Sequence, residues 1–320
     1  MVINGCTKQQ VLQKSKGYYM KQKFGKDESI KVIGSGEHMF NNIMNVFGIL
    51  ITVLALYPLY YVFIASFSKP YYVENGDVMF RIIGFTLDSY KQAFAKNSIW
   101  IAYGNTIFYT VFGVLFNMFF TATMAYALSK TRLLARKWLT IFVVFTMWFS
   151  AGIIPLYMTF RDYHLLNTRF AVLGGFALNT YNLIILKSFF EQVPSSLEEA
   201  AFIDGAGNLR IFSMIYLPLS KPALATVGLF YGVNRWNGYF WAMNLLTDDN
   251  KMPLQVLLKK LIVNKISNET EAQIVTFNST WSPLTVIYAI IIIAIVPMLV
   301  AYPYVQKYFR SGITLGANKG

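Results

Sequence analysis

The sequence has few of the residues on which most catalytic and metal sites depend. Its 320 residues include one cysteine, Cys6, and two histidines, His38 and His164. A single cysteine excludes an intramolecular disulfide and a thiolate metal cluster. Two histidines leave almost no material for a histidine-based metal site or a Ser-His triad, so we expect no metal site.

Charged residues are also scarce. They make up 13% of the chain, whereas hydrophobic residues make up 55% and aromatic residues 17%. A soluble domain of this length could not bury so much apolar surface. The composition therefore predicts an integral membrane protein.

The apolar residues are gathered in long blocks. A helix that crosses a bilayer needs about 20 consecutive, mostly apolar residues, because each residue adds about 1.5 Å across a core about 30 Å thick. Six blocks meet this requirement: 43–67, 105–128, 138–160, 170–190, 222–246 and 283–305. The sequence therefore predicts an all-α protein with six transmembrane helices.

The formal net charge of +13 could suggest a nucleic-acid partner, but the distribution of the charge argues against one. Lysine and arginine cluster in short stretches between the blocks, where positive charge marks the cytoplasmic side. Seven lysines lie in residues 1–40, and the 130–137 link carries four basic residues and no acid. This pattern predicts that both termini and the 130–137 link are cytoplasmic.

The same pattern divides the chain into three parts. Residues 1–40 are polar and lysine-rich without an apolar stretch, which indicates a flexible cytoplasmic lead-in and no cleavable signal peptide. Residues 41–310 form the expected transmembrane domain, and residues 311–320 form a cytoplasmic tail. The loops at 68–104 and 247–281 mix charges of both signs, as external loops tolerate.

Arg235 is the one strongly basic residue well inside a block. An intramembrane charge is by default a candidate functional residue. The alternative is an arginine that snorkels toward the interface or is paired within the bundle. The sequence leaves both interpretations open.

The link between the fourth and fifth blocks is the most informative stretch. Ser195 or Ser196 can cap a helix that the following glutamates favour at its positive end. Glycines at 205 and 207 then break this helix, and a second short helix is expected from about Leu209 to a point before Pro218. The pattern predicts two short helices joined at an angle on the cytoplasmic side.

The link also carries a spaced motif: E-A-A, three residues, G, nine residues, I-x-L-P. Its seven fixed positions are Glu199, Ala200, Ala201, Gly205, Ile215, Leu217 and Pro218. Here the chain resembles the binding-protein-dependent permeases of ABC importers, whose cytoplasmic loop carries this motif and docks in a cleft of the ATPase subunit.

The resemblance covers roughly residues 41–320 and is narrower than the superfamily. The runs WFSAGIIPLYMTFRDYHLLNTRFA, NLIILKSFFEQVPSSLEEAAFIDGAG and QKYFRSGITLGANKG, with residues 236–241, are similar to the carbohydrate-uptake branch. They resemble most the second maltose-permease subunit and its oligosaccharide relatives. Gly238 departs from many sugar permeases, which carry an acidic residue after Trp-Asn.

The resemblance implies a set of partners. These are a second, different permease subunit, two ATPase subunits inside, a solute-binding protein outside and a sugar substrate, all at a bacterial cytoplasmic membrane. The chain would be a multi-pass transport subunit and not an enzyme. It would bind no cofactor, because ATP and Mg belong to the ATPase subunits; no G-x-x-x-x-G-K-[ST] loop occurs in the sequence.

Two groups of site residues follow from these expectations. In the loop, Ala200 and Ala201 would allow close approach to the ATPase, while Glu198, Glu199 or Asp204 would form charge-assisted bonds to it. For the sugar path the candidates are Asn234, Trp236, Asn237, Tyr239 and Trp241, because aromatic faces stack on sugars and amides pair with hydroxyls. The alternative for each aromatic residue is packing or the interfacial belt.

Three other functions remain as alternatives. A permease of the same superfamily for a non-sugar solute would share every feature above. An ion-coupled secondary transporter would be expected to carry buried acids, and the six blocks contain no Asp or Glu. A membrane enzyme would need a cluster of His, Asp or Glu at the membrane face.

Overall fold

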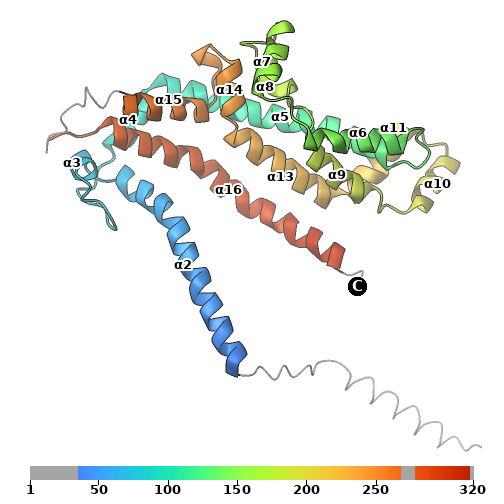
Figure 1. Ribbon diagram of the computed structural model, residues 1–320, viewed down its shortest axis with the longest axis horizontal. Coiled ribbons are helices and arrows are strands. Elements are labelled where there is room, and N and C mark those ends of the chain that lie inside the picture. The colour runs from blue at the N-terminus through green and yellow to red at the C-terminus, as the bar shows by residue number, and fades with distance from the viewer. Residues whose placement is uncertain (1–34, 268–277, 318–320) are drawn as a thin grey trace, which may run out of the picture. The chain divides into compact units, whose positions relative to one another are not determined.

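The computed structural model describes residues 35–267 and 278–317, and in these ranges the secondary structure is helical with no strand (Figure 1). The all-α prediction is confirmed for this part of the chain. Residues 1–34 of the expected lead-in and 318–320 of the expected tail lie outside the described residues. The chain divides into two compact units, residues 1–58 and 59–320.

The described part of the first unit belongs to one helix, α2 (Ser35–Ser66), which continues into the second unit. It begins before the expected domain boundary at residue 41. A window of 18 residues within 39–66 has a mean hydropathy of 2.1, high enough for a membrane span. This helix accounts for the first predicted block.

The second unit is built on three long helices. They are α5 (Asn97–Ser129), α13 (Lys221–Asn237) and α16 (Pro283–Ala317), and α13 packs against both of the others (Figure 1). A shorter helix, α9 (Thr180–Phe190), packs on α5 and α13. Ala122 and Ala125 of α5 are buried in this interface, where small side chains let helices approach closely.

Six continuous spans are not confirmed. Three helical segments are long and apolar enough to cross a membrane: Met39–Ser66, Asn97–Ser129 and Pro283–Pro303. The third block is split into α6 (Arg136–Trp148) and α7 (Ile153–Asp162), which meet at 115°. Gly152 precedes α7 with φ of +84°, a backbone angle that favours glycine.

The fourth and fifth blocks are broken as well. The fourth is divided into α8 (Arg169–Gly174) and α9, and neither is long enough to span alone. In the fifth, α13 stops at Asn237 and α14 (Phe240–Leu245) follows, while the helical segment 208–219 meets α13 at 84°. The described residues thus hold three candidate spans, or five if each bent pair counts as one.

Short elements gather at the two ends of the second unit. At one end lie α4 (Asp88–Ala95) and α15 (Leu254–Ser267), which pack on α16 (Figure 1). The Asn105 amide at this end of α5 donates to the carbonyls of Asn250 and Met252, at 2.7 and 3.1 Å. The remaining short elements near this end are α3 (Pro70–Glu74) and η2 (Asp249–Lys251).

At the opposite end lies the link that carries the spaced motif (Figure 1). Its elements are α10 (Ser195–Ile203), α11 (Asn208–Ile211), the π-helical turn η1 (Phe212–Tyr216) and α12 (Leu217–Leu219). We call residues 194–218 the motif loop.

Candidate functional site

The first helix of the motif loop begins as predicted, but without a serine cap. The residue before α10 is Pro194, and no side chain caps the helix. Proline has a fixed φ suited to a helix start, so Ser195 and Ser196 fall inside the first turn. The predicted cap was therefore wrong by one or two residues, while the predicted glutamate near the positive end of the helix, Glu198, is confirmed.

Gly205 forms the turn between the two arms of the motif loop. Its φ is +77°, and the Ala206 N–H donates to the carbonyl of Ala201 at 2.8 Å across the end of α10. This pattern is the Schellman ending of a helix, in which the residue with positive φ is usually glycine. A Cβ built on Gly205 meets no atom within 4 Å. The backbone angle alone therefore requires glycine here.

The second arm of the motif loop runs further than predicted. It starts at Asn208, close to the expected Leu209, but helical structure passes through Pro218 to Leu219. The expected stop before Pro218 was wrong because the preceding turn is a π-helix. Pro218 then lies in the first turn of a new helical segment, where its missing N–H costs little.

Much of the motif loop faces outward from the second unit. Ile203 and Leu209 are 87% and 83% exposed, and Met214 is also exposed. A hollow of about 200 Å³ lies between Ala201, Asp204 and Met214. Exposed apolar residues beside a hollow are typical of a surface that another protein covers.

The three predicted acids of the loop have different environments. Glu198 is half-buried, and its Oε2 accepts hydrogen bonds from Lys130 Nζ at 2.6 Å and from the Tyr216 hydroxyl at 2.7 Å. Burial opposes the negative charge, but these bonds and the charges of Lys130 and Arg132 hold the pKa of Glu198 below its usual range. Glu199 and Asp204 are exposed. Glu198 is therefore committed to contacts within the chain.

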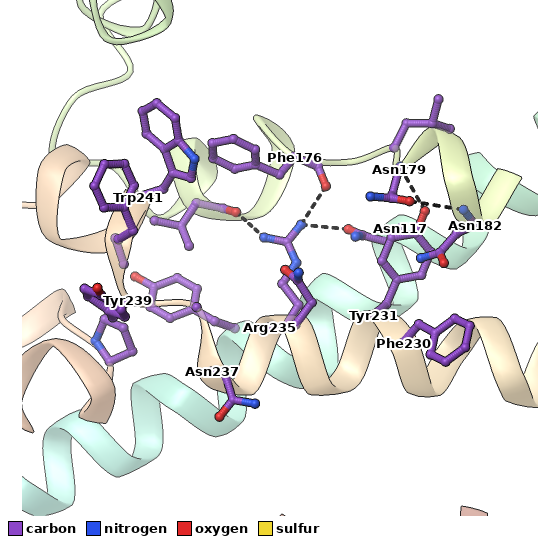
Figure 2. Close-up of a pocket in the computed structure, with 18 of the residues that line it drawn as sticks. Asn117, Phe176, Asn179, Asn182, Phe230, Tyr231, Arg235, Asn237, Tyr239 and Trp241 are labelled. Carbon is purple, nitrogen blue, oxygen red and sulfur yellow. Dashed lines mark hydrogen bonds between the residues drawn. The ribbon is translucent and has the colours of Figure 1, made fainter. Parts of the chain in front are cut away.

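A cavity of about 640 Å³ lies where the broken helices meet α5 (Figure 2). It is bordered by the break between α8 and α9 and by the break between α13 and α14. Helix interruptions at membrane depth are tolerated where the backbone lines a cavity or is covered by protein. The polar and aromatic residues that line it include Asn117, Phe176, Asn179, Asn182, Tyr231, Asn234, Asn237, Tyr239, Phe240 and Trp241.

Four of the five residues expected on the sugar path line this cavity: Asn234, Asn237, Tyr239 and Trp241. Trp236 does not. Its side chain is buried, its Nε1 donates to the Ala294 carbonyl of α16 at 3.1 Å, and its ring lies edge-on to Tyr103. Residues 234 and 237 share a helix face that residue 236 does not share. Trp236 therefore packs between helices, which is the alternative given for the aromatic residues in the sequence analysis.

The cavity also contains residues that the sequence did not single out for it. Asn117 comes from α5, Asn179 and Asn182 from the start of α9, and Tyr231 from α13. The Tyr231 hydroxyl lies 2.7 Å from Thr121 Oγ1 and accepts the Asn179 N–H at 3.0 Å. The signal that could have found the three asparagines is their amide groups inside apolar blocks.

Arg235 is fixed by neutral oxygen atoms at the edge of the cavity (Figure 2). Its guanidinium donates to the carbonyls of Val172, Leu173 and Phe176 and to Asn117 Oδ1. Val172 and Leu173 lie in the last turn of α8, whose carbonyls lack partners within the helix. These contacts favour the interpretation of Arg235 as a residue paired within the bundle.

The charge of Arg235 has no acidic counterpart in the cavity lining. Among the described residues that border the cavity, Arg235 is the one with a charged side chain, and none is an Asp or Glu. Hydrogen bonds to carbonyls stabilise the guanidinium but do not neutralise its charge. The described lining of the cavity therefore carries one net positive charge.

Comparisons with known proteins agree with this arrangement. A family model described as "Binding-protein-dependent transport system inner membrane component" matches residues 98–314. The polygalacturonan/rhamnogalacturonan transport system permease protein YtcP of Bacillus subtilis (strain 168) is 38% identical over 88% of this chain and 99% of its own. The maltodextrin transport system permease protein MdxG of the same organism is 29% identical over 89% and 99%.

A solved structure is similar in fold and in sequence. It is a chain from the crystal structure of a bacterial ABC transporter involved in the import of the acidic polysaccharide alginate. The TM-score is 0.79 and the identity 41%, over 86% of this chain and 98% of the other.

Proposed function

The chain belongs to the family of inner membrane components of binding-protein-dependent transport systems, and from this premise we propose that it passes an oligosaccharide through the cavity between α5, α9 and α13. As a member of this family it is a membrane transport subunit and not an enzyme. The inner-membrane family and the apolar helices support a multi-pass protein of the plasma membrane.

The chemistry of the cavity lining is the observation that supports a sugar. Aromatic rings such as Tyr239 and Trp241 can stack on the C–H faces of a pyranose. Amides such as Asn234 and Asn237 can both donate to and accept from hydroxyl groups. The volume of about 640 Å³ lies within the range of about 300–1,000 Å³ that is usual for small-molecule sites.

An oligosaccharide that contains uronic acids is the first candidate within this class. The relative YtcP is named for polygalacturonan and rhamnogalacturonan, and the similar solved structure for alginate. A carboxylated sugar would be attracted by the positive charge of Arg235. Because the donors of Arg235 already bind carbonyls, this attraction acts through the field rather than through a direct contact.

A neutral oligosaccharide is the second candidate, since MdxG is named for maltodextrin. The two candidate substrates can be distinguished by measuring the ATPase activity of the complete complex in lipid nanodiscs together with its solute-binding protein. We expect oligogalacturonates to stimulate ATP hydrolysis more than maltodextrins of equal length. Stimulation by amino acids or phosphate, and by neither sugar series, would indicate the non-sugar permease instead.

The motif loop would be the docking element for a separate ATPase that carries ATP and Mg. The exposed Ile203, Leu209 and Met214 would supply the apolar part of the contact, and Ala200 and Ala201 would allow a close approach. Glu199 and Asp204, both exposed, would supply the charge-assisted bonds. The remaining motif residues Ile215 and Leu217 are half-buried and would hold the second arm in place.

Transport would proceed by alternating access with the expected partners. ATP binding can drive the change only by stabilising one conformation over the other. A second permease subunit would complete the pathway, and an external solute-binding protein would deliver the sugar. Six spans with both termini in the cytoplasm would put the motif loop on the side of the ATPase. An ion-coupled mechanism would need no such loop.

A further inference from the structure

The end of α5 is bound to both arms of the motif loop. Lys130 follows the last residue of α5, and its side chain is 9% exposed. Its ammonium contacts Glu198 on α10 at 2.6 Å and lies 3.6 Å from the ring centroid of Tyr216 on the second arm. The same ammonium lies 4.2 Å from the ring of Tyr126 on α5 itself. One cation therefore joins three elements.

Further contacts close this arrangement. The Tyr216 hydroxyl donates to the Glu198 oxygen that also binds Lys130. Arg132 lies 3.4 Å from the other Glu198 oxygen, places its guanidinium over the ring of Phe202, and donates to Asn208 Oδ1. We call Lys130, Glu198 and Tyr216 the Lys130 clamp.

The clamp resists relative motion of the loop and α5. An ion pair with both side chains mostly buried is costly to separate, because each charge would be left without a partner away from water. The tyrosine rings add cation–π attraction to the same ammonium. These contacts therefore favour joint movement of α10 and the end of α5.

The other part of this path is α5 itself. It is one helix from Asn97 to Ser129 without an internal proline. Asn117 on this helix lines the cavity and accepts a hydrogen bond from Arg235, which in turn binds the end of α8. A rigid helix with the clamp at its end and Asn117 along its length links the loop to the cavity.

We propose that the Lys130 clamp is the mechanical link through which the motif loop moves α5 and opens or closes the cavity. Lys130 is thus a positioning residue for transport rather than a group that touches the sugar. This inference rests on the proposed transport function and on the loop as the ATPase contact. The motif loop is also joined to α9 and α13 through the chain itself, and the clamp adds a direct contact with α5.

The first test measures transport for each ATP hydrolysed by the complete complex in proteoliposomes. For Lys130→Met and Glu198→Gln we expect ATP hydrolysis to continue while sugar uptake per ATP falls at least tenfold. Lys130→Arg keeps the cation and should keep most of the coupling. Lys137→Met removes an exposed lysine of the same link and should behave as wild type. Wild-type uptake per ATP in both clamp variants would overturn the proposal.

A second test leaves the residues of the Lys130 clamp unchanged, so it does not depend on whether complexes with clamp variants assemble. Cys6 is replaced, and spin labels are placed on Thr131 and Ser196, both exposed, in the otherwise wild-type complex. We expect the same distance distribution between the labels with and without trapped ATP, because the loop and the end of α5 move together. A distribution that shifts between the two states would overturn the clamp, whereas failure of the proposed function would show as absence of uptake by the wild-type complex.

Discussion

Arg235 shows how a charged side chain is held among apolar helices. Its guanidinium satisfies carbonyls at the end of α8 that have no partner in their own helix. Space for the side chain comes from Gly113 on α5, where a Cβ would lie 2.8 Å from Arg235 Nε. Gly113 and Arg235 thus form one structural feature shared by α5, α8 and α13.

Gly113→Val should therefore destabilise the protein. Displacing Arg235 leaves buried carbonyls without donors, at a cost of about 1–3 kcal/mol for each unsatisfied group. The matched control is Gly104→Val on the same helix, because a Cβ there meets no atom within 4 Å. Thermal unfolding in detergent, followed by size-exclusion chromatography, measures the difference. Equal stability of the two variants would contradict this role of Gly113.

Trp236 and Asn234 should differ in what their substitution affects. Asn234→Ala removes an amide from the cavity and should reduce uptake while the stability stays near that of wild type. Trp236→Ala removes a buried ring and its bond to Ala294, and should destabilise the protein by about 3–5 kcal/mol. Uptake and thermal unfolding are measured on both. A stable Trp236→Ala protein with impaired uptake would instead indicate that Trp236 is part of the sugar path.

Residue roles could be predicted from the sequence only in part. Asn234 and Asn237 follow from their amides in an apolar block, but Trp236 was grouped with them although it lies on another face of the helix. The partners of Arg235 could not be predicted, because they are main-chain carbonyls exposed by a break in α8. The partner of Glu198 could not be predicted either, because Lys130 lies 68 residues away in the sequence.

The turn between the two arms of the motif loop depends on Gly205. Gly205→Ala places a side chain on a residue with positive φ, which costs about 1–2 kcal/mol. Gly205→Asp adds charge as well and should abolish copurification of the ATPase subunit and sugar uptake together, with membrane insertion intact.

Gly207→Ala is the control for this prediction, since Gly207 has φ of −74° and open space around its Cβ position. It should keep near wild-type association. Wild-type levels of ATPase association in Gly205→Asp would show that the turn is not part of the docking element.

The elements themselves were predicted with uneven success. The two arms of the motif loop follow from Gly205 and the prolines, although the second arm continues through Pro218 because a π-helical turn precedes it. Blocks three, four and five were each counted as one span. Glycines interrupt these blocks in the sequence, and the structure breaks the helices near Gly152, after Gly174 and at Gly238. Hydropathy reports that residues avoid water, not that the helix between them is continuous, so the count of spans followed apolar length alone.

For the whole molecule, the charge pattern predicts the orientation in the membrane. In a protein whose Cys6 has been replaced, the cysteine of Asp77→Cys should react with an impermeant thiol reagent added outside intact cells. Lys137→Cys should react only after the membrane is opened, because the charge pattern predicts a cytoplasmic 130–137 link. Both positions are exposed, so burial does not limit the reaction. Labelling of Lys137→Cys from outside would contradict the orientation and place the motif loop on the wrong side for an ATPase.

The most direct test of the transport function is uptake into proteoliposomes that contain the complete complex and its solute-binding protein. Radiolabelled oligogalacturonate is supplied on the side of the binding protein and ATP on the side of the motif loop. We expect ATP-dependent accumulation of the sugar, little accumulation without ATP, and none with the Gly205→Asp subunit. An absence of ATP-dependent uptake for oligogalacturonate and for neutral oligosaccharides alike would contradict the account, as would sugar uptake driven by an ion gradient in the absence of the ATPase subunits.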